Sequence, residues 1–144
     1  MTTKKTEAKK TSMDLSALDS VSCAEAGSPL EIIHPATKEP TGITIRLLGA
    51  DSKAYREKQL ALMRKRFRGG KSSQHLSLGA AEADAIGIIA ACTLGWENLE
   101  EHGELVPFSE AKARDIYTRY PAIREQVSAF IEDRANFLPP LKED

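Results

Sequence analysis

Cysteine and histidine are the residues of this chain that most readily supply nucleophiles or metal ligands. The sequence holds two cysteines, Cys23 and Cys92, and three histidines, His34, His75 and His102. None of them has the spacing to another that a zinc site needs. Cys92 lies within an apolar run, where a thiol is buried and poorly reactive. The sequence therefore predicts no metal site, no cofactor, no cysteine nucleophile and no disulfide framework.

A phosphate-binding loop is suggested by Gly70-Lys71-Ser72, but the surrounding residues do not fit it. The motif needs a glycine five residues before its second glycine, and this chain has Lys65 there. It also needs a strand before the loop, whereas a helix is expected here. We interpret these residues as a flexible loop.

Carboxylates gather around Gly103, at Glu97, Glu100, Glu101 and Glu104. Their spacing lacks the alternating oxygen ligands of a calcium loop. The cluster is interpreted as a solvated acidic turn.

The run Arg64-Lys65-Arg66-Phe67-Arg68 is the one candidate binding site, and its cations are Arg64, Lys65, Arg66 and Arg68. Three interpretations stay open. The run is a solvated helix end whose cations complement the helix dipole, a grip for nucleic-acid phosphates, or a docking site for an acidic protein segment. A net charge of −1 disfavours nucleic acid, because a basic domain is expected for that function.

Charge is unevenly spread along the chain. Residues 51–75 hold eight Lys and Arg against two Asp and Glu, whereas residues 76–144 hold six against thirteen. Opposite charges on different parts of a molecule can steer partners or self-association.

These residues are positioned by one domain, residues 29–140, after an N-terminal tail. The 144 residues are 41% hydrophobic and 28% charged, as expected for a globular protein of one domain. Residues 1–28 are polar and poor in apolar side chains, which predicts a disordered, flexible tail with a weak helix around Met13–Leu18.

A β-hairpin is predicted from Leu30–His34 and Gly42–Leu47. Apolar Ile43 and Ile45 alternate with polar residues, which is the period of a half-buried strand. The intervening loop has proline at both ends, and a lone hairpin must pack on something else to be stable.

About four helices are predicted to follow the hairpin, so the fold class is mainly α with one hairpin, α+β. Asp51 and Ser52 can cap the first helix, which ends near Phe67 with Leu60, Met63 and Phe67 on one stripe. The second, about Ala80–Leu94, is apolar nearly all round and is expected to be central and buried.

The last two predicted helices begin at Ser109 and Pro121. Ser109 can cap the third, and Pro121 fits the first turn of the fourth. Pro139-Pro140 should stop the fourth. The expected apolar faces are Ala113, Ile116, Tyr117 and Tyr120 on the third and Ile123, Val127, Phe130 and Ile131 on the fourth.

No membrane or export segment is expected. The longest strongly apolar run, Ala85–Gly95, is too short for a membrane span, which takes about 20 residues. Met1 leads into a polar, lysine-rich segment rather than an apolar signal peptide. We expect the protein to act in a cytoplasm.

Three segments, in this order, resemble the tail assembly chaperones of long-tailed bacteriophages of the siphophage type. The first is the early hairpin, with Ile32-Ile33-His34-Pro35 and Gly42-Ile43-Thr44-Ile45. The second is Gly95-Trp96 followed by an acidic turn into Pro107-Phe108-Ser109, and the last runs from Pro121 to Phe137. The likeness covers about residues 30–138 and excludes the N-terminal tail.

The resemblance implies a non-enzymatic protein of virion morphogenesis. It would act in the host cytoplasm, bind the tape measure protein and tail tube subunits, and be absent from the mature virion. Many relatives are made in two lengths through ribosomal frameshifting. The family has no motif that carries its binding residues, so the basic run remains the candidate site.

Two alternatives compete with the chaperone. A structural tail or virion completion protein would share the size and the helical content but stay in the virion. A small nucleic-acid-binding phage regulator would use the basic run. We expect no specific nucleic-acid binding and no membrane binding, and self-association is left open.

Overall fold

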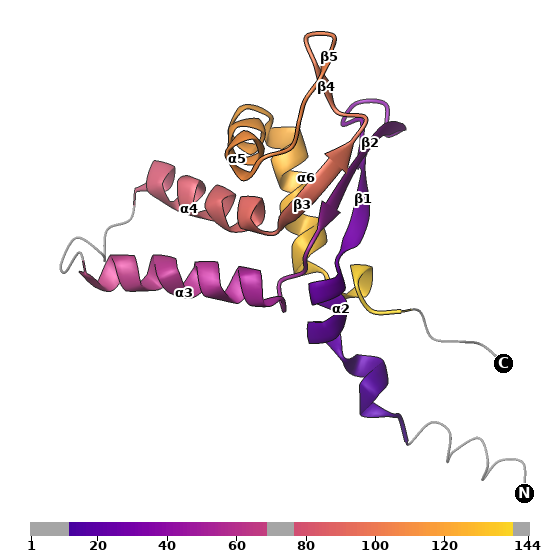
Figure 1. Cartoon of the computed structure of the whole chain (residues 1–144), viewed down its shortest axis with the longest axis vertical. Coiled ribbons are helices and arrows are strands. Elements are labelled where there is room, and N and C mark those ends of the chain that lie inside the picture. Colours follow the sequence, from indigo (N-terminus) through magenta and orange to yellow (C-terminus); the bar gives the residue numbers. More distant parts are fainter. Residues whose placement is uncertain (1–11, 69–76, 140–144) are drawn as a thin grey trace, which may run out of the picture.

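A three-stranded antiparallel sheet stands at the centre of the fold. The structure is a computed structural model that describes residues 12–68 and 77–139 (Figure 1). The predicted hairpin is confirmed as β1 (Ser28–Ile33) and β2 (Pro40–Leu47), and β2 also pairs with β3 (Thr93–Glu97), in the order β1-β2-β3. The hairpin is thus completed by a strand from much later in the chain.

The central strand β2 has one buried and one open face, as its alternation predicts. Ile45 and Leu47 are fully buried, whereas Arg46 is exposed. Opposite Ile45 lie Leu30 on β1 and Trp96 on β3. The helices cover the face that carries Ile45.

The third strand corrects the predicted end of the second long helix. That helix was expected to reach Leu94, but α4 (Leu78–Ala91) ends before Thr93. The Thr93 hydroxyl donates to the carbonyl of Ile89 at 2.8 Å, within the last turn of α4. β-branched Thr93 favours extended backbone, and Gly95 is a poor helix residue, so the chain turns directly into β3.

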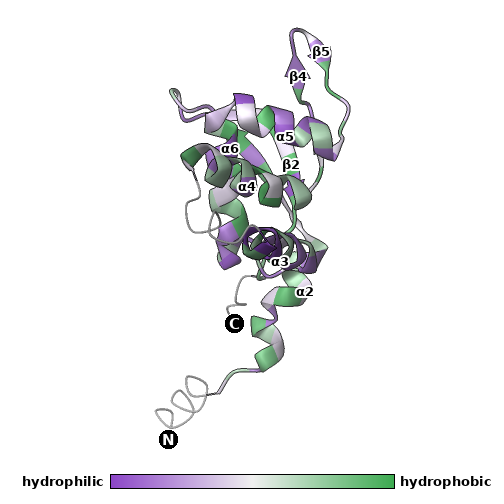
Figure 2. Ribbon diagram, turned by 90° about the vertical axis from the view of Figure 1, so that its left-hand side faces the viewer, coloured by the Kyte–Doolittle hydropathy of each residue, from purple (hydrophilic) through white to green (hydrophobic). Residues whose placement is uncertain are grey.

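Besides the sheet, the fold has four longer helices: α3 (Lys53–Arg68), α4, α5 (Glu110–Arg119) and α6 (Pro121–Glu132). Ser109 caps α5 by accepting from the Lys112 backbone N–H at 3.0 Å, and Pro121 occupies the first turn of α6, both as predicted. Figures 1 and 2 place α4 between α5 and α3, so α3 lies at the margin of the fold.

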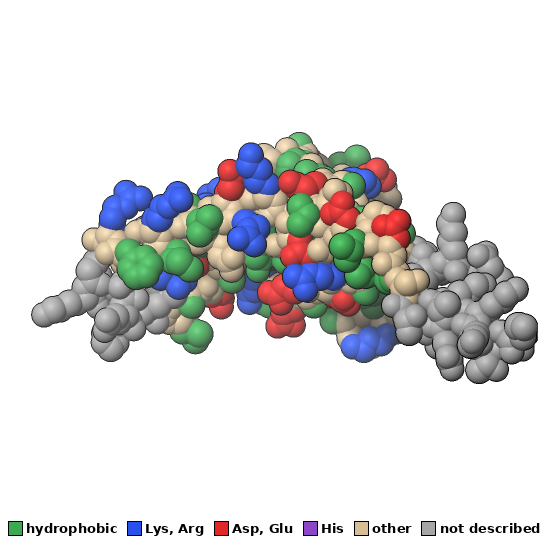
Figure 3. All heavy atoms as spheres, turned by 90° about the horizontal axis from the view of Figure 1, so that it is seen from below, with side chains coloured by type: hydrophobic (Ala, Val, Ile, Leu, Met, Phe, Trp, Pro, Cys, Tyr) green, Lys and Arg blue, Asp and Glu red, His purple; other side chains and the backbone are tan. Residues whose placement is uncertain are grey.

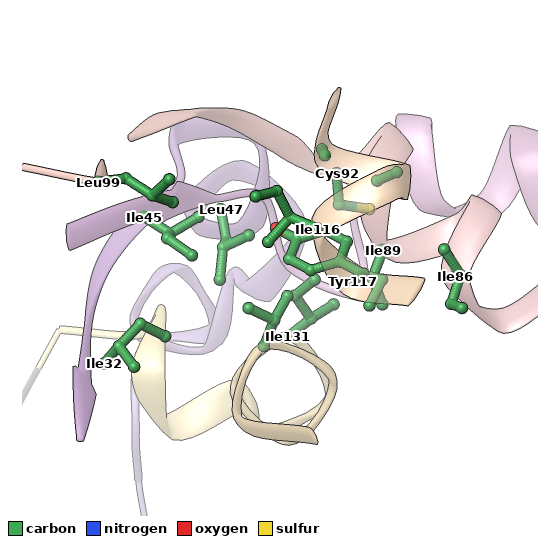
Figure 4. Close-up of a cluster of buried hydrophobic side chains, with 13 residues drawn as sticks. Ile32, Ile45, Leu47, Ile86, Ile89, Cys92, Leu99, Ile116, Tyr117 and Ile131 are labelled. Carbon is green, nitrogen blue, oxygen red and sulfur yellow. The ribbon is translucent and has the colours of Figure 1, made fainter. Parts of the chain in front are cut away.

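The core is built by the sheet face, the end of α4, and the inner faces of α5 and α6 (Figure 4). Tyr117 and Ile116 of α5 meet Ile131 of α6 and the strand residues Ile45 and Leu47. Of the predicted apolar faces, Ala113, Ile116, Tyr117, Val127 and Ile131 are buried, Ile123 and Phe130 are half-buried, and Tyr120 is exposed.

Helix α4 is central only in its second half. Ile89 is buried and Ile88 half-buried, whereas Leu78 at the start is exposed. Gly87 is buried where α3 crosses, but a Cβ there would meet only the end of the Lys58 side chain, at 3.4 Å. Gly87 is therefore not required by a close approach of two backbones.

The N-terminal segment is more ordered than predicted over residues 12–28. A short 3-10 helix, η1 (Leu15–Leu18), matches the weak helix expected there, but α2 (Ser20–Ala26) was expected to be part of the tail. Asp19 caps α2 through the Ser22 N–H at 3.0 Å, and Ala24 is buried. The predicted tail residues 1–11 lie outside the described residues.

The C-terminal end also differs from the prediction. Helix α6 ends at Glu132, seven residues before Pro139, and a 3-10 turn, η3 (Arg134–Asn136), follows. The Asp133 side chain caps that turn, and buried Phe137 packs edge-on against Phe130, with ring centroids 5.4 Å apart. The start of this capped 3-10 turn, rather than the prolines, marks the end of the helix.

Candidate interaction surface

Helix α3 is held at its first turn by residues from two segments. Ser52, fully buried, accepts from the Tyr55 backbone N–H at 3.3 Å, which confirms the predicted cap. Glu25 of α2 accepts from the Lys53 N–H at 3.2 Å, so a carboxylate also sits at the positive end of the helix dipole. The start of α3 is therefore anchored to the rest of the fold.

Beyond that anchor, α3 makes its main contact with α4 and buries little. Tyr55 packs against the core and Lys58 lies over Gly87. Arg66 reaches Asp84 of α4 at 3.3 Å. None of the 16 residues of α3 is fully buried, so the helix has a side that the described part of the chain leaves uncovered.

The uncovered side carries the stripe predicted from the sequence. Leu60, Met63 and Phe67 follow i, i+3, i+7 spacing and share one face, and they are 44%, 47% and 76% exposed. Figure 3 shows hydrophobic side chains on this end of the molecule beside Lys and Arg. Apolar residues grouped this way mark interaction sites more often than scattered ones do.

The four cations of the candidate site lie around the C-terminal end of α3. Arg64, Lys65, Arg66 and Arg68 are all exposed. Among the described residues only Arg66 of these four has an ion pair, the contact with Asp84. The cations therefore flank the apolar stripe, but they do not converge on one point. Gly70-Lys71-Ser72 lies outside the described residues.

A cavity separates this stripe from α2. It has a volume of about 560 Å³, and its lining includes Val21 and Glu25 on one side and Arg56 and Leu60 on the other. Val21 is 55% exposed. Val21 and Leu60 thus place apolar side chains on both sides of a hollow whose other lining residues are charged.

The acidic segment forms a small arm at the opposite end of the molecule (Figure 1). Strands β4 (Glu100–Glu101) and β5 (Glu104–Leu105) pair across a two-residue turn. His102 and Gly103 both have positive φ, 55° and 81°, which is the geometry of a type I′ hairpin turn. Trp96 is half-buried under this arm and donates to the Val106 carbonyl at 2.7 Å.

Glu101 corrects the interpretation of that segment as a plain solvated turn. Its carboxylate accepts from Arg119 at 2.6 Å, from the Tyr120 hydroxyl at 2.7 Å and from Lys112 at 3.4 Å. The Arg119 hydrogen bond, followed by that of Tyr120, lowers the pKa of Glu101 to about 2. Glu101 fastens the arm to α5, while Glu97, Glu100 and Glu104 are exposed.

The cysteines and histidines have no catalytic arrangement in the described part of the chain. Cys92 is fully buried, and burial raises the pKa of its thiol to about 11. The His34 ring accepts from the backbone N–H groups of Ala36 and Thr37, which organises the hairpin loop. His102 lies in the arm turn, and His75 is outside the described residues.

Within residues 12–68 and 77–139, no group of three or more His, Cys, Asp or Glu side chains is arranged to hold a metal ion. No described helix is long and apolar enough to cross a bilayer.

A second hollow lies between the hairpin loop and the start of α6. Two adjoining cavities of about 430 and 300 Å³ share Ile33, Pro35 and Gln126. The Gln126 amide there exchanges two hydrogen bonds with the Ile33 backbone, both 2.8 Å. The polar groups of Gln126 are therefore already paired, whereas Lys38 and Glu125 of the same lining have no ion pair among the described residues.

Sequence reasoning missed Val21 as part of the interaction surface. Val21 was placed in the tail, although Asp19 three residues before Ser22 is a helix-start signal. That signal, with the apolar spacing of Leu18 and Val21, could have revealed α2. Nothing local could have shown that α2 lies beside Leu60.

Comparison of the chain with protein-family models, with curated proteins and with solved structures finds no significant match.

Proposed function

We propose that this protein is a non-enzymatic tail assembly chaperone of a long-tailed bacteriophage. It binds the tape measure protein through the uncovered side of α3 in the host cytoplasm, contacts tail tube subunits, and is absent from the finished virion. The observation that carries the proposal is a 16-residue helix with no buried residue and an exposed stripe of Leu60, Met63 and Phe67.

The chemistry of that surface supports transient binding of a helix. An amphipathic helix laid on a shallow apolar face is a recurring mode of peptide recognition. Burying a few half-exposed side chains provides modest affinity. Flanking cations raise the association rate and orient the partner more than they raise the affinity. A partner held this way can later be displaced, as a chaperone requires. The partner is inferred from the resemblance to tail assembly chaperones. That resemblance lies in the order of the hairpin, the acidic arm and the last helices.

The functional test is a pull-down from infected cells together with mass spectrometry of purified virions. We expect the tape measure protein in the pull-down and no stoichiometric copy of this chain in virions. Stoichiometric presence in virions, without tape measure protein in the pull-down, would instead support a structural tail or completion protein.

The basic residues are tested separately. Changing Arg64, Lys65, Arg66 and Arg68 to Ala should weaken co-purification and leave folding intact, because exposed charges add little to stability. A double variant, Arg64→Ala with Arg68→Ala, has a control of equal charge change in Lys38→Ala with Arg114→Ala, both exposed and on other elements. If all these variants co-purify normally, docking is apolar and only the basic part of the proposal fails.

A nucleic-acid-binding regulator is the second candidate. The observation that favours it is the group of exposed cations on α3 without ion pairs among the described residues, Arg64, Lys65 and Arg68. A titration of a labelled oligonucleotide with the chain at several salt concentrations separates it from the chaperone.

A further inference from the structure

The cavity between α2 and α3 has the form of a groove with one apolar side chain on each wall and five charged residues around them. Val21 stands on one wall and Leu60 on the other, both lining a space of about 560 Å³. Met63 and Phe67 continue the α3 wall for two more turns. A helix laid along α3 would therefore touch side chains of two elements rather than one.

Two acidic groups of this groove have hydrogen-bond partners within the chain. Asp51 accepts two hydrogen bonds from Arg134, at 2.6 and 2.9 Å, and its pKa is lowered to about 2 by that contact. Glu25 accepts from the Lys53 N–H at the start of α3. Of the three carboxylates that line the groove, only Asp51 is therefore paired with a cation among the described residues, whereas the backbone N–H that Glu25 binds carries no compensating charge.

The basic groups are not occupied in the same way. Arg56 lines the groove, and Arg64 and Arg68 follow on the exposed side of α3, and none of the three has an ion pair among the described residues. The groove is mixed in charge at the start of α3, where Glu57 is also present, and basic at its end. A partner therefore meets an excess of positive charge that rises along α3.

We infer that the groove between α2 and α3 binds an acidic amphipathic helix of a partner protein. The apolar stripe of that helix contacts Val21, Leu60 and Met63, and its carboxylates pair with Arg64 and Arg68. Because the basic charge is concentrated at the end of α3, the more acidic end of the partner lies there. The inference deepens the proposed function in that it names the chemistry of the partner and adds α2 to the site.

The probe is a synthetic 18-residue helical peptide with Leu on one stripe and Glu beside it. Its matched control has Lys in place of every Glu. Fluorescence anisotropy with the full chain should show at least tenfold tighter binding of the Glu peptide at low salt, because opposite charges meet in one case and like charges in the other. The preference should shrink as salt is raised.

Three variants locate the peptide. Met63→Asp and Val21→Asp should each weaken binding of the Glu peptide at least tenfold, since each puts a carboxylate on one wall of the groove. Leu105→Asp, which makes the same change at an exposed leucine of the acidic arm, should leave binding unchanged. Arg64→Glu with Arg68→Glu should reverse the preference towards the Lys peptide. Circular dichroism checks that each variant is folded.

Several outcomes would overturn the inference. These are equal binding of the two peptides, no binding of either, or a loss with Met63→Asp but none with Val21→Asp, which would leave α3 acting alone. A concentration-dependent dimer in sedimentation velocity that Met63→Asp abolishes would assign the groove to a second copy of the chain. If the Glu peptide binds as expected but no tape measure protein is captured from infected cells, the proposed function fails and this inference stands.

Discussion

At the scale of single residues, Glu101 links elements that the sequence does not connect. Three donors converge on its carboxylate, from Arg119, Tyr120 and Lys112. Its low pKa, about 2, means that folding favours the charged form. The stabilisation is complete above the ordinary pKa of 4.5 and is lost as the pH falls towards about 2.

We therefore expect Glu101→Gln to lower the melting temperature at pH 7 and to flatten its decrease below about pH 4.5. Asp51, whose pKa is also lowered to about 2, leaves some acid sensitivity in the variant. Glu104→Gln, at an exposed neighbour in the same arm, is the control and should behave as the wild type. Thermal melts followed by circular dichroism from pH 7 to pH 2.5 measure both. Parallel curves for Glu101→Gln and the wild type would contradict the role of Glu101.

A buried pair, Thr93 and Tyr117, provides a second prediction at this scale. Their side-chain oxygens are 2.7 Å apart, and Thr93 already donates to the Ile89 carbonyl, so the Tyr117 hydroxyl must donate to Thr93. Tyr117→Phe leaves the Thr93 oxygen without a donor and should lower the free energy of unfolding by about 1 kcal/mol.

Urea unfolding of Tyr117→Phe, Thr93→Val and the double variant measures this coupling. The double variant should lose less than the sum of the single ones, because Thr93→Val removes the acceptor that Tyr117→Phe leaves unpaired. Strictly additive losses would show that the hydrogen bond contributes nothing.

At the scale of elements, replacing either of two glycines by alanine should change the free energy of unfolding, and the two changes should have opposite signs. Gly87→Ala puts a Cβ 3.4 Å from the mobile end of Lys58, an ordinary contact, and removes a weak helix residue. It should raise the free energy of unfolding by up to about 1 kcal/mol. Gly49→Ala puts a Cβ 2.9 Å from that of Ala24 and 3.1 Å from the Phe137 ring.

Gly49→Ala should therefore lower the free energy of unfolding by about 1–3 kcal/mol, as overpacking of a close contact does. Urea unfolding of the two variants beside the wild type gives both values. If Gly87→Ala destabilises, α3 and α4 pack more tightly than the Lys58 contact indicates.

Some elements of the fold could be predicted from the sequence and others could not. The hairpin, α3, α5 and the start of α6 follow from alternation, caps and helical spacing, which are local signals. The third strand could not be predicted this way, because Thr93–Glu97 is recognisable only by pairing with β2. For the candidate site, the stripe and cations of α3 were visible in the sequence, but their exposure and the nearness of Val21 depend on tertiary packing.

At the scale of the whole molecule, an acidic and a basic group of side chains lie on separate projections of the fold. The acidic arm and the basic end of α3 project in different directions (Figure 1). The net charge is only −1, so among the described residues the attraction for nucleic acid is expected mainly from the cations of α3. A few cations on one helix give weak binding without sequence preference.

We expect only weak binding to DNA or RNA oligonucleotides, lost as salt approaches physiological concentration. Fluorescence anisotropy of a labelled oligonucleotide, titrated with the chain at several salt concentrations, tests this. The Arg64→Ala with Arg68→Ala variant should remove most of the residual binding. Sub-micromolar affinity at physiological salt would favour the nucleic-acid-binding regulator over the chaperone.

The Gln126 amide protects part of the outer edge of β1 from pairing with another chain. A glutamine that gives one N–H and takes one from the Ile33 backbone imitates the adjoining strand of a sheet for the length of a single residue. An unprotected sheet edge invites a strand from another chain, which is a route to aggregation. The Gln126 side chain of α6 thus occupies the free hydrogen-bonding groups of one residue at the outer edge of β1. A strand from another chain cannot pair at that position while Gln126 is bound there.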